Sequence, residues 1–271
     1  MIHKRIDLNG KGAFLVTYVH DKNTQLWDKV GEWAPEDRPA IIVNPGGRYF
    51  YCSEREGEPI AFPFLNAGYN VFVLYYRTAE ASVFPAPLED VSLAIWHIRQ
   101  NAKEYNTNPD KIAVAGFSAG GNLASMIATQ WYRGDLAERL GIPEGGNRPN
   151  AVVLGYAPTN LERRIVPNMT VGAIYESNPP EVTTVNYIDE HTPPCFIWHT
   201  MEDENVPVSN AIGFAAKCLE NHVPFELHIF QNGPHGLSLN TDLTGYKLPH
   251  PVNVESWVPM CINWMNKLFD F

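Results

Sequence analysis

Short runs of apolar and β-branched residues alternate along the chain with longer stretches whose apolar positions recur at helical spacing. Most of the later short runs are almost continuously apolar, which is typical of strands buried on both faces. The alternation predicts an α/β fold with a mostly parallel, twisted sheet of about eight strands and helices on both faces. The predicted strands span residues 14–19, 40–44, 70–76, 112–117, 151–156, 195–199 and 225–230. The predicted helices span residues 59–67, 87–105, 120–131, 207–222 and 254–269.

Two stretches depart from this alternation. Residues 3–8 and 13–20 flank Asn9-Gly10, a strong hairpin signal, so we expect an antiparallel pair at one edge of the sheet. Residues 158–194 are rich in Asn, Pro, Glu and Thr and have no clear period. Because long irregular segments are usually functional or flexible, we expect a small cover over the site.

The length of 271 residues fits a single domain over residues 1–271.

The net charge limits the expected binding partners, and the cysteines indicate the expected cellular compartment. Lys and Arg number 20 and Asp and Glu number 30, so the formal charge is 20 − 30 = −10. An acidic surface repels phosphate backbones and anionic lipids, so we expect neither a nucleic-acid nor a membrane partner. No apolar run approaches the ~20 residues of a membrane helix, and the N-terminus lacks the apolar core of a signal peptide. Four cysteines without CxxC spacing indicate free thiols, as in a cytoplasmic protein.

The sequence Gly-Phe-Ser-Ala-Gly at residues 116–120 is the strongest chemical signal, because it has the GxSxG pattern. A predicted strand leads directly into it and a predicted helix leads directly out, which is the setting that presents a nucleophile on a sharp turn. Glycines on either side remove side chains that would clash in such a turn. Ser118 is therefore the predicted nucleophile, and the Ala119 N–H at the helix N-terminus is a predicted oxyanion donor.

A serine hydroxyl needs a base to accept its proton, and nine histidines are available. His235 fits best, because it follows the last predicted strand across a short loop. His222 and His228 belong to a predicted helix end and a strand, where structural roles are expected. His199 ends a strand and could line the site.

The third member of the predicted triad must orient the imidazole and stabilise its cation. Glu202, Asp203 and Glu204 compete for this role after the strand that precedes the last one. We select Asp203, which gives the chain order Ser118, Asp203, His235, with the acid between nucleophile and base. Asp90 and Asp189 lie in other connections and are expected to be surface or capping carboxylates.

A glycine pair follows the strand at residues 40–44 and allows the backbone to approach a substrate closely. We therefore predict that the N–H groups of Gly47 and Arg48 act with that of Ala119 as the oxyanion hole. The alternative is a glycine turn that contacts no ligand. Arg77, at another strand end, is expected to hold a neighbouring loop by charge-assisted hydrogen bonds.

The chain resembles the esterase and lipase group of α/β-hydrolases, above all its bacterial branch of carboxylesterases, acetyl-xylan-esterase-like enzymes and sugar hydrolases. The motifs that carry the resemblance, in the family's order, are PGGRYFYCSEREGEP at 45–59, VLYYR at 73–77, AGFSAGGNLA at 115–124, WHTMEDENVPVSN at 198–210 and PHGLSL at 234–239. The resemblance implies that Ser118 is the nucleophile, Asp203 the acid and His235 the base. It places the oxyanion loop at residues 46–48. The family usually has a third glycine where this chain has Arg48, which could instead point into the site and bind a substrate group.

These features predict a serine carboxylesterase that hydrolyses short-chain, preferably acetyl, esters through an acyl-enzyme. The resemblance adds acetylated sugars or xylan fragments as candidate small-molecule substrates. No long amphipathic insertion follows residue 155, so we expect an open site. Tyr49, Tyr156 and Leu237, together with Phe50 and Tyr51, are the residues predicted to shape an acyl pocket or stack on a sugar.

We expect no cofactor and no metal, because the histidines and cysteines lack ligand spacing. Three other functions stay open. The same triad could act on amides, as in an arylformamidase or a peptidase. The fold could be a catalytically silent receptor for a small molecule. An interaction protein would need a large exposed apolar patch, and the apolar last helix at residues 254–269 could form a homodimer contact, although packing on the sheet explains it more simply.

Overall fold

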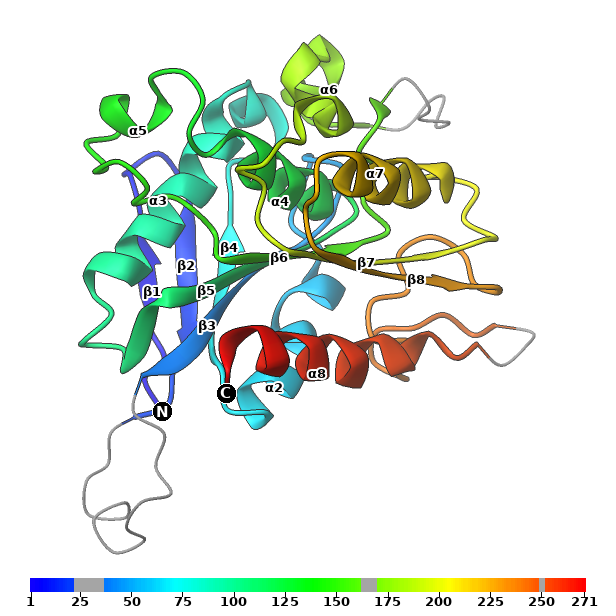
Figure 1. Cartoon of the computed structure of the whole chain (residues 1–271), viewed down its shortest axis with the longest axis horizontal. Helices are drawn as coiled ribbons and strands as arrows, with labels where there is room; N and C mark the ends of the chain where they lie inside the picture. Colours follow the sequence, from blue (N-terminus) through cyan, green and yellow to red (C-terminus); the bar gives the residue numbers. More distant parts are fainter. Residues whose placement is uncertain (22–36, 162–169, 249–251) are drawn as a thin grey trace, which may run out of the picture.

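One sheet of eight strands organises this computed structural model, which describes residues 1–21, 37–161, 170–248 and 252–271 (Figure 1). The strand order is β1-β2-β4-β3-β5-β6-β7-β8. Strands β3 to β8 run parallel to their neighbours, and β2 pairs antiparallel with both β1 and β4. The mostly parallel α/β sheet is therefore confirmed. The strands are β1 Arg5–Asp7, β2 Phe14–Tyr18, β3 Arg38–Asn44, β4 Asn70–Tyr75, β5 Thr107–Phe117, β6 Ala151–Gly155, β7 Cys195–Thr200 and β8 Phe225–Phe230.

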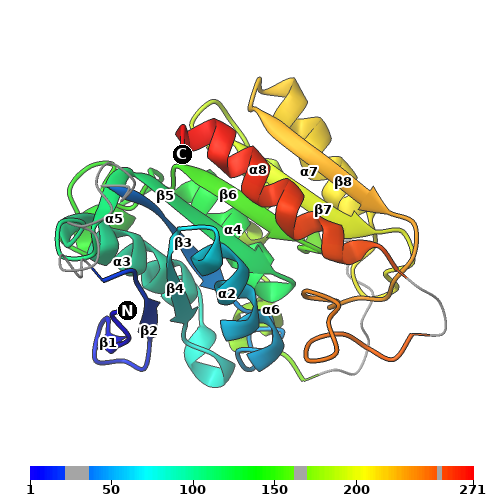
Figure 2. The same ribbon diagram turned by 90° about the horizontal axis from the view of Figure 1, so that it is seen from below.

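Helices cover both faces of the sheet and bury its two apolar surfaces (Figures 1 and 2). Helices α3, α4 and α7 pack on one face, and α2 and α8 pack on the other. Strands β3, β6 and β7 are buried along their whole length, which explains why their sequences are almost continuously apolar. The helices are α2 Glu58–Asn66, α3 Ala86–Gln100, α4 Ala119–Gln130, α5 Leu136–Arg139, α6 Ala173–Ser177, α7 Ser209–Glu220 and α8 Trp257–Phe269.

The predicted helix at residues 87–105 is wrong at its C-terminal end. Helix α3 stops at Gln100, and not at Tyr105, because Asn101 caps it. The Asn101 side chain donates to the His97 carbonyl at 2.7 Å and so satisfies one of the free acceptors of the last turn. The chain then turns through Asn106, which has a φ of 50°, and β5 begins at Thr107, earlier than the predicted strand at 112–117.

The predicted hairpin at the sheet edge is confirmed, with a longer loop than a two-residue turn. Strand β1 pairs with β2 in the register Asp7 to Phe14. The Asp7 carboxylate accepts the backbone N–H groups of Asn9 and Gly10 at 2.9 and 2.5 Å, and Gly10 adopts a φ of 64°. These local hydrogen bonds define the turn.

The described part of the expected cover, residues 158–161 and 170–194, packs on α4 and on the loop after β3. Its short helix α6 and the two 3-10 turns Pro180–Val182 and Thr184–Tyr187 lie on the α4 side of the sheet (Figure 1). The Asn122 side chain on α4 donates to the carbonyls of Pro158 and Val182, both at 2.8 Å. Residues 162–169 of the expected cover lie outside the described residues.

Arg77 has the loop-fixing role expected for it. Its guanidinium donates to Asp90 at 2.9 Å, to Glu89 at 3.0 Å and to the Ala86 carbonyl at 2.7 Å. Asp90 is fully buried, and burial raises the pKa of its carboxyl against the lowering effect of Arg77. The cluster therefore joins the end of β4 to the first turn of α3.

The apolar last helix, α8, packs against the sheet. Trp257, Cys261, Met265 and Phe269 point into the core on the α2 side. This packing explains the apolar pattern of the helix, and a homodimer stays a prediction. No helix in the described parts of the chain is long and apolar enough to cross a membrane.

Candidate active site

Ser118 sits between the end of β5 and the start of α4, at the carboxyl edge of the sheet. Its backbone has φ 52° and ψ −121°, a region that side chains other than glycine rarely occupy. The Ser118 N–H donates to the Gly155 carbonyl of β6 at 3.0 Å, which holds the turn against the neighbouring strand. This strand–turn–helix geometry is the one that the GxSxG pattern predicted.

The two glycines of the GxSxG pattern are required by close backbone approach. A Cβ atom on Gly116 would overlap the Gly120 carbonyl, and a Cβ atom on Gly120 would overlap the Asn44 carbonyl. Since no side chain fits at either place, the turn around Ser118 depends on both glycines.

The structure brings the three residues of the predicted triad into one hydrogen-bonded chain. Ser118 Oγ lies 2.7 Å from His235 Nε2, and His235 Nδ1 lies 2.7 Å from Asp203 Oδ2. A carboxylate only accepts hydrogen bonds, so the proton between them belongs to Nδ1. His235 Nε2 is then free to accept the proton of the serine hydroxyl. The Asp203 carboxylate is fully buried, and the His235 side chain is 15% exposed.

Of the three competing carboxylates, only Asp203 reaches the imidazole. Its second oxygen, Oδ1, accepts the N–H groups of Asn205 and Val206 at 2.9 and 2.8 Å, which fixes the carboxylate plane. Glu202 turns the other way, and its oxygens accept from the Asn232 side chain and the Gly233 N–H. It thereby holds the loop that carries His235.

His199 lies beneath the triad and is fully buried. Its Nδ1 lies 2.9 Å from the Thr200 backbone nitrogen and 3.1 Å from the Thr200 carbonyl oxygen. Its Nε2 lies 3.9 Å from Asp203 Oδ2 and has no hydrogen-bond partner among the described residues. Burial lowers the pKa of His199 to about 4, so the ring is neutral at physiological pH.

The loop after β3 has three consecutive residues with positive φ. Gly47, Arg48 and Tyr49 adopt φ values of 119°, 59° and 58°. Within the described part of the chain, the N–H groups of Gly47 and Arg48 donate to no protein acceptor. Ala119 is the first residue of α4, so its N–H has no acceptor within its own helix.

Arg48 adopts the positive φ of this loop although it lacks the conformational freedom of glycine. Its guanidinium lies over the Tyr51 ring, 5.8 Å from the centroid. Its carbonyl accepts the Gly172 N–H at 3.0 Å, which ties the loop to the cover. A third glycine is thus not needed for this loop conformation.

Three residues predicted to contact substrate are buried. Tyr49 is 0% exposed and donates to the Asn122 side chain at 3.1 Å. Tyr156 and Leu237 are 2% and 0% exposed. Their contact with a substrate stays a prediction, and burial favours a supporting role. Phe50 and Tyr51, by contrast, are 39% and 48% exposed beside the oxyanion loop.

A cavity of about 510 Å³ opens beside His235. Carboxylate and amide groups from the loops after β7 and β8 supply its polar lining, and two aliphatic side chains supply an apolar side. The lining residues are Glu202, Glu204, Asn205, Asn232, Gly233, Pro234, His235, Leu248 and Val252. Such a lining suits a neutral group with several hydroxyls.

Sequence reasoning missed Glu56, a buried carboxylate under the oxyanion loop. It is 5% exposed and accepts the Gly46 N–H at 2.9 Å. The surrounding sequence SEREGEP contains three glutamates, and no local pattern distinguishes the buried one. Only the tertiary packing identifies it.

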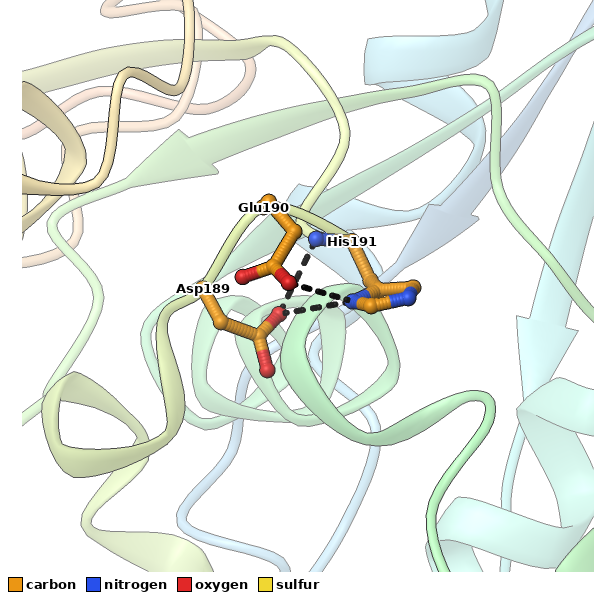
Figure 3. A group of neighbouring side chains, drawn as sticks. All are labelled: Asp189, Glu190 and His191. Carbon is orange, nitrogen blue, oxygen red and sulfur yellow. Dashed lines mark hydrogen bonds and ion pairs between the residues drawn. The ribbon is translucent and has the colours of Figure 1, made fainter.

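In the described parts of the chain, one cluster has side-chain atoms close enough together to approach a cation. It consists of Asp189, Glu190 and His191 (Figure 3). The Asp189 carboxylate already binds the Arg133 guanidinium at 2.5 Å and the Tyr132 hydroxyl. The Arg133 guanidinium therefore already balances the charge of the Asp189 carboxylate. We interpret the cluster as a surface ion-pair group.

The chain matches one family model and is similar to several solved structures. The family model BD-FAE matches residues 32–218. An α/β hydrolase enzyme from a Medee basin deep-sea metagenome library is 36% identical, with a TM-score of 0.79, and the match covers 100% of this chain and 99% of that one. The acetyl ester-xyloside bifunctional hydrolase from Caldicellulosiruptor lactoaceticus is 32% identical, with a TM-score of 0.73, over 95% of this chain and 88% of that one.

A curated relative, the acetylxylan esterase of Xylanibacter ruminicola, is 29% identical over 74% of this chain and 42% of its own length. The chain spans about a third to a half of the length of the first curated relatives that it matches.

Proposed function

Because the chain belongs to the BD-FAE family and has the α/β-hydrolase fold, we propose that it is a serine carboxylesterase that hydrolyses short-chain acyl esters. The observation that carries the proposal is the continuous chain of hydrogen bonds from Ser118 through His235 to Asp203. A strained serine at a helix N-terminus, next to a base that a buried carboxylate orients, is the arrangement that acyl transfer requires.

The proposed reaction begins when Ser118 Oγ attacks the acyl carbonyl and His235 Nε2 accepts its proton. Asp203 keeps the imidazole in the Nδ1–H tautomer and stabilises the cation. The oxyanion is bound by the N–H groups of Gly47, Arg48 and Ala119. His235 then protonates the leaving alcohol, and water hydrolyses the acyl-enzyme with His235 again as base.

We further propose acetylated sugars as the substrate class. Phe50 and Tyr51 offer exposed rings beside the oxyanion loop, and rings of this kind can pack against the apolar face of a sugar. The polar cavity beside His235 could take the hydroxyls of the leaving alcohol. The names of two relatives, an acetylxylan esterase and an acetyl ester-xyloside hydrolase, support the same class.

A series of p-nitrophenyl esters from acetate to decanoate tests the acyl preference. We expect kcat/KM to be highest at acetate and to fall as the acyl chain lengthens. Release of acetate from acetylated xylo-oligosaccharides, measured in parallel, tests the alcohol side. A maximum at eight carbons or longer would contradict the proposal, and so would faster turnover of N-formyl or peptide substrates than of esters.

A further inference from the structure

Glu56 is a buried carboxylate that the proposed reaction does not use. It lies on the 3-10 turn Glu54–Glu56, which joins the oxyanion loop to α2. Its Oε2 accepts the Gly46 N–H at 2.9 Å, and its Oε1 accepts the Tyr156 hydroxyl at 2.6 Å. Burial of a carboxylate costs free energy unless hydrogen bonds compensate it, so both contacts are needed to hold it in place.

Gly46 brings Glu56 very close to the nucleophile. A Cβ atom at Gly46 would lie 2.6 Å from Glu56 Oε2 and 2.9 Å from Ser118 Cβ. The position of Glu56 therefore sets the position of Gly46, and through it the direction of the next two N–H groups in the chain, those of Gly47 and Arg48.

Tyr156 carries the contact from Glu56 to the base. Its hydroxyl accepts the Ser238 N–H at 3.1 Å, and its ring packs edge-on against the His235 ring at a centroid distance of 5.1 Å. Burial and the nearby Glu56 raise the pKa of Tyr156 well above its ordinary value, so the hydroxyl stays protonated and donates to Glu56.

The residue before Glu56 holds the same loop from the other side. The Arg55 guanidinium donates to the carbonyls of Gly236 and Thr244 at 2.5 and 2.7 Å. The Arg55 carbonyl accepts the Ser238 hydroxyl at 2.6 Å. One short turn thus contacts both the loop that carries the oxyanion donors and the loop that carries His235.

We propose that Glu56 is a positioning residue for catalysis, which sets the oxyanion loop and the His235 loop at a fixed distance through Gly46 and Tyr156. This inference rests on the proposed esterase function. Oxyanion donors act only within about 2.7–3.1 Å of the developing charge, and buried supporting contacts keep them there. Gly46 and Tyr156 share one carboxylate, so a shift of either loop disturbs the other.

The test compares Glu56→Gln and Tyr156→Phe with Tyr69→Phe. Tyr69 is a matched control, because it is a fully buried tyrosine in the same core cluster and its hydroxyl donates to Asn266 at 2.6 Å, away from the site. We expect Glu56→Gln and Tyr156→Phe to lower kcat for p-nitrophenyl acetate ~10- to 100-fold with KM nearly unchanged. Phosphonylation of Ser118 by a p-nitrophenyl alkylphosphonate should slow in parallel, because its tetrahedral product needs the same donors.

Tyr69→Phe should keep the wild-type kcat even where it lowers the melting temperature as much as Tyr156→Phe does. The double variant of Glu56→Gln and Tyr156→Phe should be no slower than the slower single variant, because both substitutions alter the hydrogen bond that joins Tyr156 to Glu56. If Glu56→Gln does not fold, Tyr156→Phe decides the test alone.

Equal kcat values in Tyr156→Phe and Tyr69→Phe, at matched folded fractions, would overturn the positioning role and leave the esterase proposal intact. Absence of ester turnover in the wild type would instead overturn the esterase proposal, and the positioning role with it. The two failures are distinguishable because the second is seen before any variant is made.

Discussion

At the scale of single residues, the groups that follow strand ends could be predicted and the groups that packing buries could not. Ser118, Asp203 and His235 each lie beyond the carboxyl end of a strand. Parallel strands bring these ends to one edge of the sheet, so the positions of the three residues after their strands predicted that they meet. Glu56 is one of three neighbouring glutamates, and only its burial and its contacts with Gly46 and Tyr156 distinguish it. Tyr156 itself was expected to contact substrate, although it is buried beneath the base.

The buried His199 makes stability depend on pH. In the unfolded chain its pKa is 6.5, and in the folded protein it is about 4. Between these values the unfolded state binds more protons, so the free energy of unfolding should fall as the pH is lowered from about 6.5 to about 4. We expect His199→Gln to lose less stability over this window than the wild type.

Urea unfolding at several pH values measures this difference. His222→Gln, at an exposed position just beyond α7, is the control for replacing an imidazole by an amide. A His199→Gln slope equal to that of the wild type would show that the ring contributes nothing to the acid sensitivity.

At the scale of elements, the strands could be predicted better than the helix ends and the cover. Buried parallel strands are apolar throughout, so their sequences are distinctive. The end of α3 depends on one side-chain cap at Asn101. Helix α6 is five residues long, and no period can be read from so short a segment. Its place depends on contacts with the loop after β3 and with α4.

Gly172 is the point where the cover touches the oxyanion loop. A Cβ atom there would overlap the Tyr49 carbonyl and the Ser82 hydroxyl. We expect Gly172→Ala to push the cover away from Arg48 and to lower kcat/KM for p-nitrophenyl acetate several-fold. Gly213→Ala, on α7 where the added Cβ meets nothing within 4 Å, should leave kcat/KM unchanged. Equal activity of both variants would show that the cover does not position the loop.

We expect a large loss of stability when the Arg77 ion pairs at the junction of β4 and α3 are removed. Arg77→Met leaves the fully buried Asp90 carboxylate without its cation, which costs ~3 kcal/mol in comparable buried pairs. Lys4→Met removes an exposed pair with Glu104 and should not change stability measurably. Urea unfolding monitored by circular dichroism measures both. A loss below ~1 kcal/mol in Arg77→Met would contradict a clamp of this kind.

At the scale of the whole molecule, the sheet acts as a frame that gathers distant segments of sequence. The proposed oxyanion loop follows β3, the proposed nucleophile follows β5, the proposed acid follows β7 and the proposed base follows β8. Their shared edge is a consequence of parallel topology, which the alternation of strands and helices predicted. The substrate surface is not a consequence of topology, because it depends on which loop residues stay exposed, as Phe50 and Tyr51 do.

The measurement that tests the central claim most directly is hydrolysis of p-nitrophenyl acetate by the wild type and by Ser118→Ala, with folding matched by circular dichroism. The account predicts ester turnover by the wild type and a loss of roughly 10³-fold or more in the variant, as for removal of a triad nucleophile. Turnover that survives in Ser118→Ala, or a wild type that hydrolyses no ester, would contradict it.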